Sequence, residues 1–405
     1  MKECMKTEMR RVYRITLISA AAVLIFAYGI HFFLWGKEND RTMKAGFVYV
    51  GDTSTAYTNN FVQAQEAIQK QYGGQVETIA KYNVSEENVE EALKELVEEG
   101  CELIFTTSYG YGEKTKEYAG AYPEIQFCQA TCSNANEEPV LKNYHTFMGN
   151  IYQGRYISGV VAGMKLRELI EDGEITPEQA KAGYVGAYSC AEVISGYTAF
   201  FLGIRSVVPE ATMTVRYTNT WGNHLLEKEC AKKLIDEGCI IISQHSDTAG
   251  PAVACEETER SQVVYYVSYN ESMRDIAPTT YLTGSKINWE VYMTEAVDAV
   301  LSGKEIEKCV KGNINGNDAG AGFENGWVRM LEINEFTAAE GTQERVDELI
   351  REFKQNGIRV FQGDYTGVNP DDPSDTIDLR EGFYENEKSS APAFCYILKD
   401  VIVIE

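Results

Sequence analysis

One segment of this chain occurs twice in nearly the same form. It reads KELVEEGCELI at Lys94–Ile104 and KLIDEGCIII at Lys233–Ile242. Each copy combines the end of an amphipathic helix, a glycine stop and a short apolar strand, and a polar loop of small residues follows, at 106–112 and 244–250. Ligands of open parallel sheets bind beyond the carboxyl ends of the strands. The repeat therefore predicts two lobes that face each other across a cleft.

The rest of the chain alternates apolar strands with helices from Lys44 onward. Such a succession predicts the α/β class, with a parallel sheet sandwiched by helices in each lobe. No low-complexity linker divides the body. The expected division is 43–152 with 281–310 for lobe 1, 153–280 with 311–361 for lobe 2, and 362–405 for a C-terminal extension that ends in a strand.

The charge of the chain bears on its partners. Acidic residues outnumber basic ones 61 to 37, which gives a formal net charge of -24. Nucleic-acid binding requires a basic face, so we expect no nucleic-acid partner. We also expect a monomer.

The N-terminus carries a different pattern. Basic residues precede Ile15–Trp35, a stretch of about twenty residues without Asp, Glu, Lys or Arg, which is long enough to span a bilayer core of roughly 30 Å. The leading basic residues predict that this end stays in the cytoplasm. Cleavage patterns are poor, so residues 1–36 are interpreted as a cytoplasmic tail and an uncleaved anchor that holds an extracellular body at the cell membrane.

Motifs for catalysis are weak. His245-Ser246-Asp247 are consecutive residues, which do not place a nucleophile, a base and an orienting acid in line. Tyr109-Gly110-Tyr111-Gly112 is only half of a dinucleotide fingerprint. With four histidines in the chain, zinc has few ligands to draw on. We therefore expect no enzyme activity, no metal and no cofactor.

Aromatic residues recur at the predicted strand ends. Tyr57, Tyr109 and Tyr111 follow strands of the first lobe, Trp221 follows a strand of the second, and Trp289 opens the returning helix. Any one ring could be ordinary packing. Together they favour a planar heterocyclic ligand, which is held by stacking and a few directed hydrogen bonds.

Several segments in this order resemble the basic membrane protein family of ABC-importer substrate-binding proteins. They are GFVYVG (46–51), IFTTSYGY (104–111), GRYISGVVAG (154–163), GYVGAY with FFLGIRSVVP (183–209), NTW (219–221), LIDEGCIIISQHSDT (234–248) and INWEVY (287–292). The resemblance covers about 44–361. It implies the two-lobed type I periplasmic-binding fold, an ABC permease partner, and purine nucleosides or bases as ligands.

The resemblance also implies a set of site residues. Tyr57 and Trp221 match the rings that sandwich the base, and Lys286 matches a basic residue after the returning strand. The ligand-binding residues expected in full are Tyr57, Thr58, Ser108, Tyr109, Trp221, His245, Asp247, Asn270, Lys286 and Trp289.

Three acids that suit a grip on sugar hydroxyls in this family are missing. Thr53-Ser54-Thr55, Ala130-Thr131 and Asn270 stand in their places. Because a carboxylate accepts two hydrogen bonds, their loss predicts that a free base binds at least as well as its nucleoside.

The leading hypothesis is an extracellular solute-binding protein that closes around a purine-like base or nucleoside and delivers it to an ABC permease. Two alternatives stay open. One is a ligand sensor that presents the same cleft to a membrane partner, and the other is a cleft hydrolase.

Overall fold

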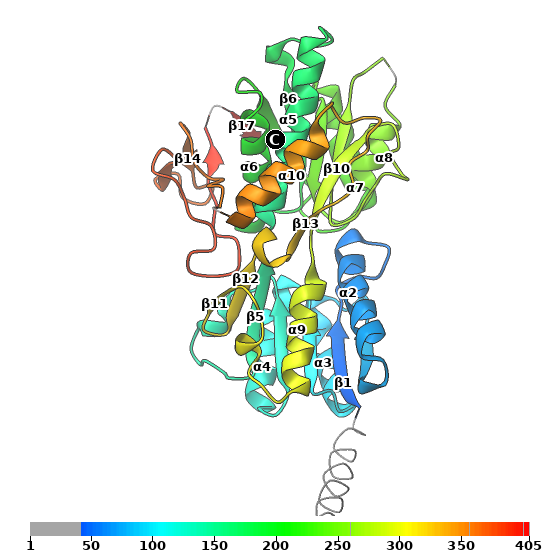
Figure 1. The fold of residues 1–405 in the computed structure, drawn as a ribbon, viewed down its shortest axis with the longest axis vertical. Helices are drawn as coiled ribbons and strands as arrows, with labels where there is room; N and C mark the ends of the chain where they lie inside the picture. The colour runs from blue at the N-terminus through cyan, green and yellow to red at the C-terminus, as the bar shows by residue number, and fades with distance from the viewer. Residues whose placement is uncertain (1–41, 260, 356, 400, 405) are drawn as a thin grey trace, which may run out of the picture.

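The computed structural model describes residues 42–259, 261–355, 357–399 and 401–404. Two seven-stranded sheets form two lobes that lie one above the other along the long axis of the molecule (Figure 1). The expected anchor at residues 15–35 lies outside the described residues. Among those that are described, no helix is both long enough and apolar enough to cross a membrane.

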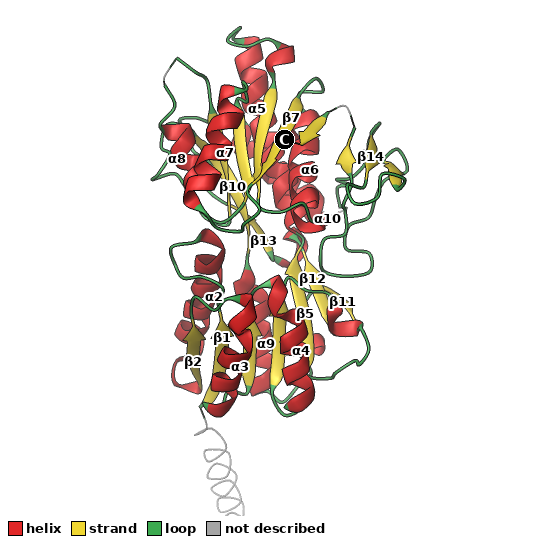
Figure 2. Ribbon diagram, turned by 180° about the vertical axis from the view of Figure 1, so that it is seen from behind, coloured by secondary structure: helices red, strands yellow, loops and turns green. Residues whose placement is uncertain are grey.

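Lobe 1 contains the sheet β11-β12-β5-β4-β3-β1-β2. Its strands are β1 (Met43–Val48), β2 (Val76–Lys81), β3 (Leu103–Thr106), β4 (Gln126–Ala130), β5 (Tyr144–Gly149), β11 (Asn313–Asn315) and β12 (Asp318–Ala321). Its helices are α2 (Ala56–Tyr72), α3 (Val89–Glu98), α4 (Gly112–Ala121) and α9 (Trp289–Leu301), which flank the sheet (Figure 2).

Lobe 2 contains the sheet β13-β10-β9-β8-β6-β7-β17. Its strands are β6 (Lys181–Gly186), β7 (Thr212–Tyr217), β8 (Ile241–His245), β9 (Tyr265–Tyr269), β10 (Tyr281–Ile287), β13 (Val328–Met330) and β17 (Ile402–Ile404). Its helices are α5 (Ile151–Glu171), α6 (Ala191–Arg205), α7 (His224–Asp236), α8 (Gly250–Glu256) and α10 (Thr342–Gln355).

The predicted fold class is confirmed, with one addition at the sheet edges. The inner strands of both sheets pair in parallel, whereas β11 pairs antiparallel with β12 and β13 pairs antiparallel with β10. Short antiparallel strands of this kind are common at the edge of an otherwise parallel sheet.

The expected lobe boundaries differ from the strand pairing. Residues 281–287 were expected in lobe 1, but β10 pairs with β9 in lobe 2. Residues 313–321 were expected in lobe 2, but β12 pairs with β5 in lobe 1. The segment 312–326, which is rich in Gly and Asn, holds both β11 and β12. Pairing between distant strands decided these placements, and no local pattern encodes it.

The repeated segment forms the same local structure in both lobes. In lobe 1, Cys101 N–H donates to Leu96 O and Gly100 N–H to Val97 O, both at 3.0 Å. In lobe 2, Cys239 N–H donates to Leu234 O at 3.0 Å, and Gly238 has the matching bond at 2.9 Å. These are Schellman caps, and the glycines take the left-handed φ that the cap requires, +81° and +84°. Each cap ends its helix and turns the chain into β3 or β8.

The C-terminal extension forms a small sheet of its own. Its strands are β14 (Thr366–Val368), β15 (Thr376–Asp378) and β16 (Ile397–Leu398). The last strand, β17, then joins the lobe 2 sheet beside β7. Phe361, just ahead of the extension, stacks on Phe394 of the extension with ring centroids 4.5 Å apart.

A buried acid in this extension predicts a pH dependence of stability. Burial raises the pKa of Glu385 to about 7 from an ordinary 4.5. The folded protein therefore holds this proton more tightly than the unfolded chain. The resulting stabilisation is full below pH about 4.5, is lost as the pH rises through about 7, and is on the order of 3 kcal/mol.

We expect Glu385→Gln to flatten the fall in unfolding free energy between pH 5 and pH 8, because glutamine cannot lose this proton. Urea denaturation at several pH values measures the slope, and Glu387→Gln, at an exposed position nearby, is the control. Equal slopes in Glu385→Gln and in the unmodified protein would contradict the prediction.

Candidate ligand-binding site

A cavity lies between the two lobes, at the carboxyl ends of the strands. It encloses about 390 Å³ of unoccupied space, including its opening to solvent. Five lining residues belong to lobe 1 or its loops and five to lobe 2: Val50, Tyr57, Ser108, Tyr109 and Thr131 on one side, and Glu192, Trp221, His245, Asp247 and Tyr269 on the other. Both lobes therefore contribute to the wall of this cavity.

The lobe 1 wall is formed by loops that follow β1, β3 and β4. Tyr57 lies in the first turn of α2, and its hydroxyl donates to the carbonyl of Thr107. Ser108 lines the cavity, and its Oγ donates to Glu86 Oε1 at 2.6 Å. Tyr109 is 68% exposed, which places its ring at the mouth of the cavity.

The lobe 2 wall depends on a buried carboxylate behind it. Glu227 in α7 is fully buried and accepts hydrogen bonds from Ser246 Oγ at 2.8 Å and Thr248 N–H at 3.1 Å. Asp247 lies between these two residues, and its N–H donates to Trp221 O at 2.9 Å. Glu227 therefore holds the conformation of the loop that contains Asp247. The backbone hydrogen bond from Asp247 connects this loop to Trp221.

His245 forms part of the cavity floor. Its Nε2 lies 3.3 Å from Glu192 Oε1, and its ring packs on Tyr269 with centroids 4.6 Å apart. The guanidinium of Arg155 covers the Tyr269 ring at 3.6 Å. Arg155 is fully buried, and its three nitrogens have no hydrogen-bond partner among the described residues. The cation–π contact is thus what holds this charge.

Burial controls the protonation of the site. It raises the pKa of Asp247 well above its usual range, and the neighbouring carboxylates of Glu227 and Glu192 add to the effect. Burial also lowers the pKa of His245, so the imidazole is neutral at pH 7. A neutral imidazole can donate through one nitrogen and accept through the other. The site therefore presents a neutral imidazole, whose Nε2 contacts Glu192, to its ligand.

Direct contacts cross the cleft. Ala56 N–H, next to Tyr57, donates to Asp247 O at 3.1 Å. Asn59 Nδ2 donates to Glu271 Oε1 at 2.9 Å, and Lys286 Nζ donates to Gln63 Oε1 at 3.0 Å. The structure is therefore a closed arrangement of the two lobes.

Six of the ten residues predicted for the site line the cavity: Tyr57, Ser108, Tyr109, Trp221, His245 and Asp247. The other four lie elsewhere. Trp289 is core, with its ring stacked on Phe61 at 4.3 Å, and Lys286 bridges to Gln63. Thr58 follows Tyr57 in α2 and is buried. Asn270 directly follows β9 and has a left-handed backbone conformation, with φ +63°.

Sequence reasoning missed four residues that line the cavity: Val50, Thr131, Glu192 and Tyr269. Val50, Thr131 and Tyr269 lie at or just beyond the carboxyl end of a strand, and Glu192 lies in the first turn of α6, the helix that follows β6. The rule that ligands bind beyond these ends, applied to every strand and to all residue types, would have included them.

Fold and cleft together define a two-lobed solute-binding protein. The chain belongs to the Bmp family, the PnrA-like ABC transporter substrate-binding proteins, whose family model matches residues 43–358. This membership makes it a substrate-binding protein and not an enzyme, as the sequence predicted.

Individual relatives agree with this family. A purine-binding protein of Brucella abortus is 30% identical over 283 residues, which is 69% of this chain and 75% of the relative. A Haloferax volcanii protein named as an ABC transporter glucose-binding protein is 29% identical over 271 residues, 66% of this chain and 63% of the relative.

Solved structures support the fold. A solute-binding protein from Aeropyrum pernix has a TM-score of 0.63 at 14% identity and covers 82% of this chain and 95% of its own. One from Conexibacter woesei has a TM-score of 0.61 at 16% identity, covering 78% and 98%.

Close packing behind His245 gives a test of the site geometry. A Cβ atom at Gly196 in α6 would lie 2.6 Å from His245 Nδ1. We expect Gly196→Ala to displace His245 and to lower the free energy of unfolding by about 1–3 kcal/mol, the usual cost of overpacking.

The matched control is Gly120→Ala in α4, where the nearest atom to the added Cβ is Leu141 Cδ1 at 3.7 Å. Because space is available there and alanine favours helix, we expect it to stabilise the protein by about 0.5–1 kcal/mol. Chemical denaturation measures both variants. Destabilisation of equal size in the two would refute the packing argument.

Proposed function

We propose that this substrate-binding protein binds a purine-like heterocycle in the interlobe cavity, with a free base preferred. The observation that carries the proposal is the convergence of aromatic rings from both lobes on one small polar cavity. Tyr57 and Tyr109 come from lobe 1, and Trp221 and Tyr269 come from lobe 2. A planar ligand is held well by such facing rings.

The polar groups of the cavity suit the edge of a heterocycle. Glu192 and Asp247 supply acceptor oxygens for ring or exocyclic N–H groups, beside the neutral imidazole of His245. Glu192 was not among the predicted residues. Its carboxylate belongs to the lobe 2 side of the cavity.

Closure couples the ligand to the lobes. Tyr57 and Asp247 both line the cavity, and the cross-cleft bond from Ala56 N–H to Asp247 O lies directly beside them. A ligand that contacts both residues adds binding energy only in the closed form, so it shifts the hinge equilibrium toward closure. The closed complex would then deliver its ligand to the permease.

The Brucella relative is named for purine binding, which supports this ligand class. The Haloferax relative is named for glucose, so a hexose is the alternative that the experiment must include.

Calorimetry tests both the ligand class and the ring contact. We expect adenine, hypoxanthine or guanine to bind at least as tightly as the corresponding nucleoside. Trp221→Ala should weaken binding of the preferred base by about 1–3 kcal/mol, the range for base stacking on aromatic side chains. Tyr82→Ala is the control, since Tyr82 is 44% exposed and does not line the cavity.

Tight binding of glucose with no response to purines would overturn the ligand class. Purine binding that is indifferent to Trp221→Ala would show that the ring contact is misplaced.

We further propose that the N-terminal segment anchors this protein in the cell membrane, with the two lobes outside. The support is the apolar stretch Ile15–Trp35 with basic residues ahead of it. Intact-mass analysis of protein from the native membrane fraction should give a chain that begins at or near Met1. A soluble chain that begins after Gly29 would contradict the anchor.

A further inference from the structure

The C-terminal extension is attached to lobe 2 through its core. Strand β17 pairs with β7, in the register Ile402 to Met213. Phe394 and Leu398 are fully buried, and Tyr365 Oη accepts a hydrogen bond from Arg205 Nε of α6 at 2.8 Å. Separating the extension from lobe 2 would break sheet pairing and expose apolar side chains, so these two parts move as one body.

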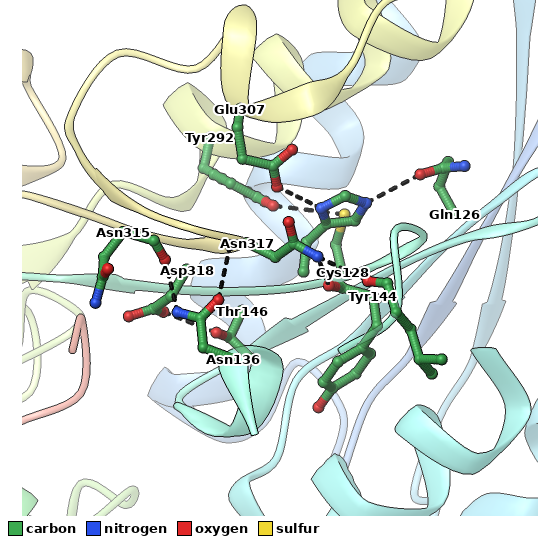
Figure 3. A network of polar contacts seen from close by, with 12 residues as sticks. Gln126, Cys128, Asn136, Tyr144, Thr146, Tyr292, Glu307, Asn315, Asn317 and Asp318 are labelled. Atoms are coloured by element: carbon green, nitrogen blue, oxygen red, sulfur yellow. Dashed lines mark hydrogen bonds and ion pairs between the residues drawn. The ribbon is translucent and has the colours of Figure 1, made fainter. Parts of the chain in front are cut away.

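The same extension is hydrogen-bonded to lobe 1. Ser390 N–H and Ser390 Oγ both donate to the Asp318 carboxylate of β12, each at 2.6 Å. Asn315 Nδ2 of β11 donates to Lys388 O, also at 2.6 Å. Asp318 is fixed in turn by Thr146 Oγ1 of β5 at 2.7 Å (Figure 3). The lobe 1 end of this connection is therefore built into the sheet.

The segment that connects the two attachments is short and internally tied. We name residues 385–394 the interlobe segment. At its base, Glu385 accepts hydrogen bonds from Ser195 Oγ of lobe 2 at 2.7 Å and from Phe394 N–H at 2.9 Å. Near its tip, Asn386 Nδ2 donates to Ser390 O at 2.7 Å. A turn closed in this way has little slack to follow lobe 1 when the lobes separate.

The contact lies beside the hinge. In the described part of the chain, the backbone passes between the lobes three times, after β5, after β10 and after β12. Asp318 lies on β12, and the extension descends from lobe 2 toward this strand (Figures 1 and 2). A small cavity at the junction is lined by Asn150 of the first crossing as well as by Asp318 and Ser390. Besides these three backbone crossings, the interlobe segment therefore connects the lobes through hydrogen bonds.

We propose that the interlobe segment is a latch that stabilises the closed arrangement of the two lobes. Its apolar attachment to lobe 2 is permanent, whereas its hydrogen bonds to lobe 1 can exchange with water when the cleft opens. The latch therefore biases the hinge equilibrium and does not fuse the lobes. It acts on the ligand-free protein and is independent of which ligand the cavity binds.

Hydrogen exchange provides a direct test, because the Ala56 amide donates across the cleft and reports closure. The variant is Asn315→Ala/Ser390→Ala in the full chain without ligand, which removes two side-chain donors to the latch contact. In the regime where exchange follows the opening equilibrium, we expect the Ala56 amide to exchange about three- to tenfold faster, the range for losing one or two hydrogen bonds. The radius of gyration from solution scattering should increase in parallel.

Two further variants separate the latch from general loosening of the extension. Asp318→Asn keeps the shape of the lobe 1 anchor but weakens its charge-assisted bonds, so it should also accelerate exchange at Ala56. Tyr396→Phe removes a hydrogen bond to Asp375 inside the extension, at 3.1 Å, and should leave Ala56 unchanged. Unchanged exchange at Ala56 in both latch variants, slower exchange, or an equal effect of Tyr396→Phe would overturn the proposal.

Discussion

The parallel pairing of β3 with β1 and of β8 with β6 is the constraint on which the site depends. Val48 pairs with Thr106 at the end of one strand pair, and Gly186 pairs with His245 at the end of the other. Neighbouring strands therefore end at the same level, so their following loops converge. Ser108 and Tyr109 leave the first pair, and His245 and Asp247 leave the second. A one-residue slip in either register would send these side chains to the opposite faces of the strands.

The cleft contains buried polar and charged groups, and their burial costs desolvation free energy unless they are hydrogen-bonded. Glu227 is fully buried, yet it accepts hydrogen bonds from Ser246 and Thr248, which offset its desolvation. Arg155 has no such partner and relies on the face of Tyr269. Replacing Arg155 would remove its contact with Tyr269, and replacing Glu227 would leave Ser246 and Thr248 without their acceptor. The two residues therefore maintain the ligand-facing side chains without lining the cavity themselves.

In the described part of the chain, the two lobes are joined by three backbone crossings. A binding protein that opens and closes depends on the balance of contacts between such lobes. Several of the contacts across the cleft are hydrogen bonds, such as Ala56 to Asp247 and Asn59 to Glu271. Polar contacts of this kind exchange with water at little net cost, so modest ligand binding energy can decide between open and closed forms. The C-terminal extension adds its own polar contact to the same balance, close to the hinge and away from the cavity.

The amino-acid sequence by itself determined the two-lobed α/β architecture, because its signals are local. Helix periodicity, glycine stops at Gly100 and Gly238, and apolar strands each act over a few residues. Placement of aromatic and polar residues at strand ends was predictable for the same reason. Tertiary structure decided which of them face the cavity: Trp289 packs on Phe61, while Glu192 and Tyr269 turn toward the cleft. It also decided that β10 belongs to lobe 2 and that Ser390 meets Asp318. These outcomes depend on contacts between segments far apart in the chain, and such contacts leave no periodic trace in the sequence.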